Sequence, residues 1–291
     1  MAERSEILMH VCGRTHTGRV RKENQDSLLF VDLAQGDAGA TGSSVGPFHF
    51  VLGADGVVLL VADGMGGRAG GAKASSMAVS AVRSALTNGA KNAADHPKDF
   101  ALRLRHALDL ANEEIHEVSR RDDALRGMGT TATLAGISAG TVYLAQVGDS
   151  RAYLVRGGDL ARVTRDQSLV QELVDSGVLS EQEAKNVRDN RILQALGTSP
   201  TVTPALTYHD LRRGDVLLLC SDGLSRVVED DEIREVVRDG TDCLAVCDQL
   251  IALANARGGP DNITVLVARV DGDGLGTANE AGGVALRAYE P

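Results

Sequence analysis

Short apolar runs joined by very short links constrain the fold of this chain most strongly. Three strand-like runs follow one another closely, at residues 131–137, 142–147 and 152–155. The links between them, Ser138-Ala139-Gly140 and Gly148-Asp149-Ser150, are short enough for hairpin turns. We therefore expect antiparallel pairing and exclude a simple doubly wound parallel sheet.

Further strands and helices are expected along the rest of the chain. Strand-like runs also occupy residues 57–62, 216–220 and 263–267. Apolar residues at helical spacing predict helices over residues 78–86, 104–118 and 244–254. Ser180 and Glu183 have the spacing of a capping box, which predicts a short helix there. The Gly- and Ala-rich stretches 35–46 and 271–291 are expected to be a flexible insert and a flexible tail.

Aspartates lie at the edge of four of these apolar runs. They are Asp63, Asp149, Asp222 and Asp261. A carboxylate beside a buried strand destabilises the fold unless a cation pairs with it. Arg151 is close enough in sequence to pair with Asp149, whereas no Lys or Arg is immediately beside the other three. Carboxylates from distant strands that meet at one sheet edge would form an oxygen-rich site for Mg²⁺ or Mn²⁺.

Two other interpretations of these residues are weaker. A single Asp-Gly pair is more simply a turn cap, but four aspartates in equivalent positions favour a shared cation site. Zinc is disfavoured because the seven histidines lie outside these motifs and no CxxC pair is present. We expect the four cysteines, Cys12, Cys220, Cys243 and Cys247, to be small packing residues.

The glycine-rich run at residues 64–71 resembles a nucleotide loop only superficially. The segment Gly71-Ala72-Lys73-Ala74 lacks the contiguous Gly-Lys-[Ser/Thr] of a phosphate-binding loop. No acidic residue occurs between Gly64 and Asp95, where a dinucleotide site needs one. A calcium loop beginning at Asp271 is rejected because Gly282 stands where its glutamate belongs. We interpret the glycines as a strand-to-helix turn that brings the backbone close to a metal.

Charge and hydropathy exclude several classes of protein. Asp and Glu number 40 against 30 Lys and Arg, giving a net charge of −10, which argues against nucleic-acid partners and anionic membranes. The N-terminus lacks the apolar run of a signal peptide, and no apolar run approaches the roughly 20 residues that span a bilayer. We therefore expect a cytoplasmic protein.

Six motifs in order resemble the metal-dependent protein phosphatases, the type 2C or PPM family, and above all its bacterial members. They are Gly18-Arg-Val-Arg-Lys-Glu-Asn-Gln-Asp26, Val61-Ala-Asp-Gly-Met-Gly-Gly67, Gly129-Thr-Thr-Ala-Thr133, Val147-Gly-Asp-Ser-Arg151, Leu219-Cys-Ser-Asp-Gly-Leu224 and Gly259-Pro-Asp-Asn-Ile-Thr264. Each motif alone is weak, whereas six in order are specific.

The resemblance implies an α+β fold, a four-layer αββα sandwich of two antiparallel β-sheets flanked by helices. It implies a catalytic domain over residues 13–270, preceded by an N-terminal extension, 1–12, and followed by the flexible tail. A small helical flap subdomain is expected at about residues 166–197, beside the metal cleft.

The resemblance also implies the metal ligands. Asp63 would bridge two divalent ions, Mn²⁺ or Mg²⁺, and Gly64 would offer its backbone carbonyl to one of them. Asp222 and Asp261 would hold the other ion. Asp149 would join Asp222 at a third, weaker ion.

Four further residues receive roles or raise questions in the same way. Arg21 would clamp the substrate phosphate, a task suited to its planar set of donors. Asp26 would act through metal-bound water. Met65 stands where many eukaryotic relatives have the histidine proposed as general acid, which leaves the acid unassigned. Gln25 replaces the acidic residue that many relatives carry before Asp26.

The implied activity is hydrolysis of phosphoserine and phosphothreonine in proteins by direct attack of a water that bridges the two ions. The partners would be bacterial Ser/Thr kinases and their substrates, and the chain would act as a monomer. The sequence identifies neither the substrate nor the kinase. A catalytically silent phosphoprotein-binding module on the same fold stays as the alternative, although the full set of metal ligands speaks against it.

Overall fold

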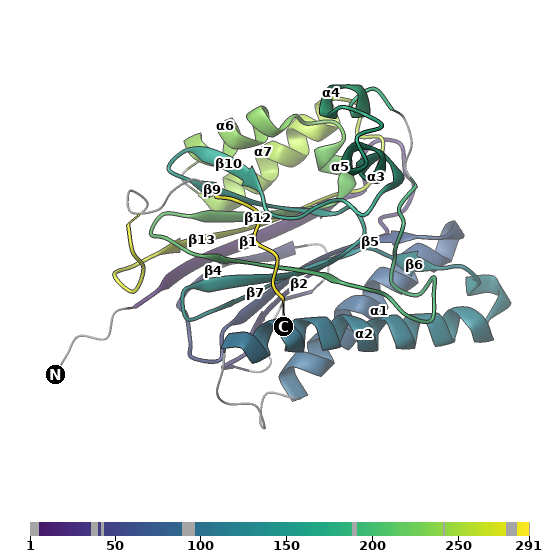
Figure 1. Cartoon of the computed structure of the whole chain (residues 1–291), viewed down its shortest axis with the longest axis horizontal. Helices are drawn as coiled ribbons and strands as arrows, with labels where there is room; N and C mark the ends of the chain where they lie inside the picture. The colour runs from purple at the N-terminus through teal and green to yellow at the C-terminus, as the bar shows by residue number, and fades with distance from the viewer. Residues whose placement is uncertain are drawn as a thin grey trace.

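The computed structural model describes residues 6–35, 40–41, 44–88, 97–187, 191–240, 242–277 and 284–290. Within them, two antiparallel β-sheets lie face to face, and helices cover the outer face of each sheet (Figure 1). The expected α+β fold, a four-layer αββα sandwich, is confirmed. No helix in the described ranges is both long and apolar enough to cross a membrane.

The first sheet has six strands among the described residues, and all of its neighbouring strands are antiparallel. Their order is β10 (Asp159–Arg162), β9 (Arg151–Arg156), β12 (Val216–Cys220), β13 (Ile263–Asp271), β1 (Leu8–His16) and β4 (Ser44–Val51). The apolar sides of α6 (Asp230–Asp239) and α7 (Cys243–Ala256) pack on its outer face.

The second sheet has seven strands in the part of the chain that the structure describes. Their order is β11 (Ala205–Asp210), β8 (Thr141–Val147), β7 (Ala132–Ser138), β5 (Val57–Met65), β2 (Asp26–Asp32) and β3 (Ala40–Thr41), with β6 (Gly129–Thr130) paired to the end of β5. The long helices α1 (Gly67–Asn88) and α2 (Pro97–Arg121) cover its outer face, and a 3-10 turn, η2 (Asp123–Leu125), follows α2.

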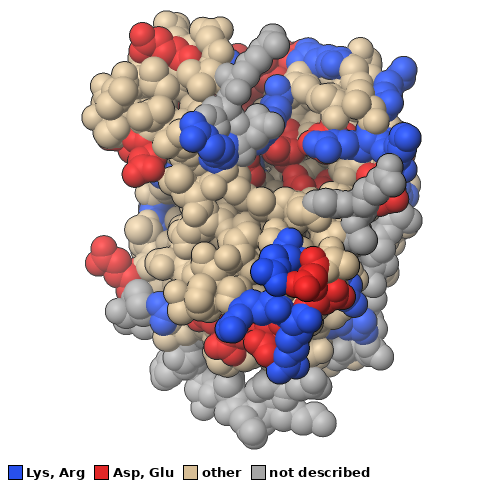
Figure 2. Space-filling view, turned by 90° about the vertical axis from the view of Figure 1, so that its right-hand side faces the viewer, with Lys and Arg blue, Asp and Glu red and all other residues tan. Residues whose placement is uncertain are grey.

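Two short helices, α3 (Leu169–Asp175) and α4 (Glu181–Ala184), lie between β10 and β11 in the chain. The predicted capping box is confirmed, because the Ser180 and Glu183 side chains each bond the other's backbone N–H at the start of α4. Both helices lie near α5 (Asp222–Ser225) at one end of the sandwich, on the right in Figure 1. That end faces the viewer in Figure 2, where the surface is hollowed.

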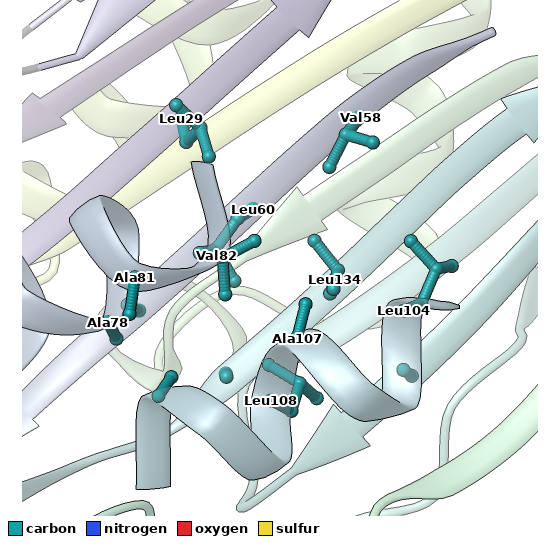
Figure 3. Close-up of a cluster of buried hydrophobic side chains, with 14 of the residues drawn as sticks. Leu29, Val58, Leu60, Ala78, Ala81, Val82, Leu104, Ala107, Leu108 and Leu134 are labelled. Atoms are coloured by element: carbon teal, nitrogen blue, oxygen red, sulfur yellow. The ribbon is translucent and has the colours of Figure 1, made fainter. Parts of the chain in front are cut away.

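The core is layered because alternate residues of a strand point to opposite faces of its sheet. In β5, Val58 and Leu60 face the helices, whereas Leu59 and Val61 face the other sheet. Figure 3 shows how the first set meets the apolar stripes of α1 and α2. Its labelled residues are Leu29, Val58, Leu60, Ala78, Ala81, Val82, Leu104, Ala107, Leu108 and Leu134. Both faces of β5 are therefore buried, which explains its unbroken apolar run.

One of the two predicted hairpins is wrong. β7 and β8 pair around residues 138–141 as predicted. However, β8 belongs to the second sheet and β9 to the first, so the chain crosses between the sheets at Asp149. Three residues can reach about 10 Å, which is the usual spacing of packed sheets. A link of this length therefore fits a sheet-to-sheet crossing as well as a hairpin.

The expected boundaries at both ends of the domain also need correction. β1 begins at Leu8 and lies between β13 and β4, so residues 8–12 belong to the sheet and not to an extension. Near the C-terminus, the backbone N–H of Tyr289 donates to the carbonyl of Leu206 in β11. Residues of the segment 284–290 therefore pair with β11, whereas residues 278–283 lie outside the described ranges.

The flexible insert expected at residues 35–46 is also partly wrong. Its last three residues begin β4, which pairs with β1 along the edge of the first sheet. Residues 36–39 and 42–43 lie outside the described part of the chain. All four cysteines are buried and unpaired, as predicted.

Candidate metal centre

A cavity of about 620 Å³ opens at the end of the sandwich where α5 begins. Figure 2 shows Asp and Glu atoms at the bottom of this hollow and Lys and Arg side chains around it. Its lining includes all four aspartates that the sequence places at strand edges, namely Asp63, Asp149, Asp222 and Asp261. Aspartates up to 198 positions apart in the chain therefore meet at one site, Asp63 and Asp261 being the most distant of the four.

The fold delivers each aspartate to the cavity by a different element. Asp63 lies near the end of β5, and Asp222 is the first residue of α5, directly after β12. Asp261 precedes β13, and Asp149 lies in the link that joins the two sheets. Strands of both sheets end here, so each aspartate lies in a strand or within two residues of one.

Asp26 lies opposite Asp63 in the pairing of β2 with β5. Its Oδ2 accepts hydrogen bonds from the hydroxyls of Ser221 and Thr264, which fixes the side chain. Its Oδ1 is buried and has no hydrogen-bond partner among the described residues. A buried carboxylate oxygen without a partner is destabilising, so this atom points to a donor or ion that the protein alone does not supply.

Burial and mutual repulsion shift the acidity of these groups. Burial raises the pKa of Asp222 to about 7, despite the opposing attraction of Arg226. Burial also raises the pKa of Asp26 to about 6. Burial, followed by the charge of Asp26, holds the pKa of Asp63 well above its usual range. Such shifts mean that the ionised carboxylates lack sufficient positive charge nearby.

Two arginines supply part of that charge. Nη2 of Arg21 donates to Oδ2 of Asp261 at 2.7 Å, at the exposed rim of the cavity. Nη2 of Arg226 lies 2.9 Å from Oδ2 of Asp149 and 2.9 Å from Oδ2 of Asp222. The expected pairing of Arg151 with Asp149 is wrong, because Arg151 forms a two-pronged ion pair with Asp166.

The chemistry of the remaining atoms fits hard divalent ions. Oδ1 of Asp222 is buried without a hydrogen-bond partner, like Oδ1 of Asp26. Among the described residues, no group of three or more Asp, Glu, His or Cys side chains is arranged so that it could hold a metal ion by itself. Mg²⁺ and similar ions are commonly held by one or two carboxylates and keep several waters, so an open set of oxygens suits them.

The glycines around Asp63 allow two backbones to approach closely. A Cβ on Gly64 would lie 2.1 Å from the carbonyl oxygen of Gly71, in the first turns of α1. A Cβ on Gly71 would in turn lie 2.7 Å from the carbonyl oxygen of Gly64. α1 begins at Gly67, inside the glycine-rich run and earlier than predicted. The run therefore forms the predicted strand-to-helix turn and a packing contact between β5 and α1 beside the cavity.

Sequence reasoning missed Asn262, which ties the loop that carries Arg21 to the start of β13. The side-chain amide of Asn262 donates to the carbonyls of Thr17 and Glu23. Its Oδ1 accepts from the backbone N–H of Gln25. The only signal in the sequence was its place directly after Asp261, and spacing alone does not show which loop an amide will hold.

Comparison with known proteins gives one consistent result. The family model described as protein phosphatase 2C matches residues 47–257. The Ser/Thr protein phosphatase PstP of Mycobacterium tuberculosis is 34% identical over 268 residues, which make up 92% of this chain and 46% of PstP. This chain therefore spans about half the length of that relative. The Ser/Thr phosphatase stp of Listeria monocytogenes is 34% identical over 264 residues, 90% of this chain and 96% of that protein.

Solved structures agree with this result. The catalytic domain of PstP in complex with two manganese ions is 33% identical and superposes with a TM-score of 0.73. The match covers 91% of this chain and 99% of that one. The fold, the ordered motifs and these relatives lead to one conclusion: the chain belongs to the protein phosphatase 2C family of metal-dependent Ser/Thr protein phosphatases and is of the bacterial type.

Proposed function

We propose that this chain removes phosphate from phosphoserine and phosphothreonine in proteins, using two divalent ions, Mn²⁺ or Mg²⁺, held in the cavity. The observation that carries the proposal is the convergence of Asp63, Asp222 and Asp261 in one cavity with too little positive charge to neutralise them. The manganese-bound PstP structure supports this choice of ions.

The ligand roles proposed here are those that the family resemblance implies. Asp63 would bridge the two ions, and the Gly64 carbonyl would bind one of them. Asp222, through its unpartnered Oδ1, and Asp261 would hold the other. When bound, the ions supply an acidified water for direct in-line attack and neutralise charge on the phosphoryl group. Asp26 lies beside Asp63 and would accept a hydrogen bond from water through its own unpartnered oxygen.

Arg21 is proposed to bind the substrate phosphate. Its side chain is 56% exposed at the mouth of the cavity and pairs with Asp261. The guanidinium N–H groups that do not contact Asp261 could form two parallel bonds to phosphate oxygens. Met65, which lines the same cavity, has no acidic proton. Water is therefore the proposed proton donor to the leaving alcohol.

The substrates are proposed to be phosphorylated proteins, among them bacterial Ser/Thr kinases and the proteins they modify, and the chain is proposed to act as a monomer. The segment at about residues 166–197 is proposed to act as a flap, which is supported by Ile192 in the cavity lining. With the boundary moved to β1, residues 8–270 would form the catalytic unit.

Matched phosphopeptides test the proposed substrate class. With Mn²⁺ present, we expect release of phosphate from phosphothreonine and phosphoserine peptides, and at least tenfold slower release from the same peptide with phosphotyrosine. Asp63→Asn should abolish all release while the protein stays folded by circular dichroism. Turnover that survives in Asp63→Asn, or a preference for phosphotyrosine, would contradict the proposal.

A further inference from the structure

We propose that Arg226 takes the place of the third ion in this chain, so that the centre works with two ions only. The third ion that the family resemblance implies would need Asp149 and Asp222. One nitrogen of Arg226, Nη2, already contacts both carboxylates, at 2.9 Å from each Oδ2. This inference rests on the two-ion centre proposed above.

The local backbone holds Arg226 in this position. Arg226 lies four residues after Asp222, one helical turn along, and directly follows α5. Its backbone N–H donates to the carbonyl of Asp222 at 2.9 Å, which closes that turn. Side chains four residues apart on a turn lie on the same face, so the contact with Asp222 follows from the helix geometry.

The two carboxylates are well shielded from water, and the arginine that joins them is partly buried. Asp149 and Asp222 are only 10% and 13% exposed, and Arg226 is 35% exposed. Charge attraction is strong where water is largely excluded, and a guanidinium stays protonated at any physiological pH. Arg226 is therefore a permanent cation between these two carboxylates. Arg151, the other nearby arginine, is already paired with Asp166 and does not compete for Asp149.

A divalent ion and this guanidinium exclude each other. Mg²⁺ binds carboxylate oxygens at about 2.0–2.1 Å, and one oxygen of each carboxylate is already in an ion pair with Arg226. Two cations on one pair of oxygens would repel and collide. By contrast, Oδ1 of Asp222 has no partner and stays available to the two-ion centre. Arg226 thus blocks the third position and leaves the proposed pair of ions untouched.

Counting bound manganese tests this inference without an activity assay. Purified full chain is dialysed to equilibrium against Mn²⁺ from micromolar to millimolar, and bound metal is measured by mass spectrometry. Wild type should bind two ions and no third. Arg226→Met, which keeps most of the volume and removes the charge, should bind a third, and Arg226→Met with Asp149→Asn should return to two. Arg226→Lys, which keeps the charge, should stay at two.

The outcomes separate the alternatives. A third ion in wild type that is lost in Asp149→Asn would overturn the inference, because Arg226 would then move aside. Two ions in a folded Arg226→Met would also overturn it. If Arg226→Met does not fold, Arg226→Gln, which also removes the charge, takes its place with the same expected third ion. Wild type that binds no manganese would instead refute the two-ion centre, and this inference with it.

Discussion

The buried carboxylates of the cavity reduce the stability of the fold when they are ionised, and Asp222 shows this most clearly. Burial raises the pKa of Asp222 to about 7 even though Arg226 attracts the ionised form. The folded pKa lies above the unfolded value, so the protein loses stability as the pH rises through about 7. A further cation beside Arg226 would stabilise the ionised form of Asp222. Without it, ionised Asp222 lowers the free energy of unfolding.

Asp222→Asn should therefore stabilise the protein that has been stripped of metal. At pH 8 without metal, we expect its melting temperature to exceed that of wild type, by about 2–4 °C for each kcal/mol gained. The difference should vanish near pH 4, where wild type is protonated at this position. The same substitution should remove the stabilisation by Mn²⁺. Differential scanning calorimetry with and without Mn²⁺ measures both effects.

Asp215 provides the matched control. It is also buried, but two bonds from Arg156 compensate its charge. Asp215→Asn should destabilise the protein by roughly 3 kcal/mol with or without metal, because it leaves a buried guanidinium unpaired. A loss of stability of the same size in metal-free Asp222→Asn would contradict the assignment of Asp222 as a ligand whose charge Arg226 compensates only in part.

The position of a single residue in the site was predictable where a sequence motif marks it. Its ion-pair partner was not predictable, because the partner depends on the three-dimensional fold. Asp63, Asp149, Asp222 and Asp261 all reach the cavity as predicted. The partner of Asp149 was not predictable, because the nearest arginine in sequence points to Asp166. The four-residue spacing of Asp222 and Arg226 was the one available signal, and it says nothing of Asp149.

At the scale of elements, the site depends on how closely β5 and α1 approach. Gly64 has no Cβ to hold α1 away, and the Gly71 carbonyl lies where that Cβ would be. The same contact positions Asp63, the neighbour of Gly64, beside β2. A change in the packing of β5 against α1 should therefore also change the geometry of the cavity.

Gly64→Ala should reduce stability and activity together. The added methyl group must displace the backbone of α1, so we expect a loss of more than about 2 kcal/mol, in the range of overpacked cores. Gly214→Ala is the control, since its Cβ would meet nothing within 4 Å. Gly214 has a positive φ of 83°, so the alanine should cost about 1–2 kcal/mol of stability through backbone strain alone. Activity should be unchanged. Chemical denaturation measures both variants, and equal losses would contradict the steric argument.

Elements were predictable where the local pattern is strong. The helical spacing in residues 104–118 corresponds to α2, and the run at 216–220 is β12. β1 and β2 were missed because they alternate little and are fixed by pairing with distant strands. The crossing at Asp149 was misread as a hairpin because three residues serve both geometries. Local sequence does not say to which sheet the next strand belongs.

At the scale of the whole molecule, proton binding and metal binding compete for the same carboxylates. Metal ligands must be ionised, so ion binding displaces protons from groups whose pKa is raised. Burial raises the pKa of Asp26 to about 6 and that of Asp222 to about 7. Both groups are partly protonated at pH 6 and ionised at pH 8. The stability of the folded chain is thus linked to both metal and pH.

The stabilisation by Mn²⁺ should be larger at pH 8 than at pH 6. Saturation at a hundred times the dissociation constant contributes about 2.7 kcal/mol, and proton competition reduces it at the lower pH. Burial lowers the pKa of His209 to about 4, which alters stability below about pH 6.5 whether metal is bound or not. Its effect cancels in the difference between melting temperatures with and without Mn²⁺. A shift that is independent of pH would contradict this linkage.

The removal and return of metal during phosphopeptide hydrolysis tests the central claim most directly. Purified protein is treated with EDTA, dialysed, and assayed on a phosphothreonine peptide before and after addition of Mn²⁺ or Mg²⁺. We predict no phosphate release without metal and full recovery with it, in wild type but not in Asp222→Asn. Absence of turnover with either ion, in protein that is folded, would contradict the account and favour a phosphoprotein-binding module on the same fold.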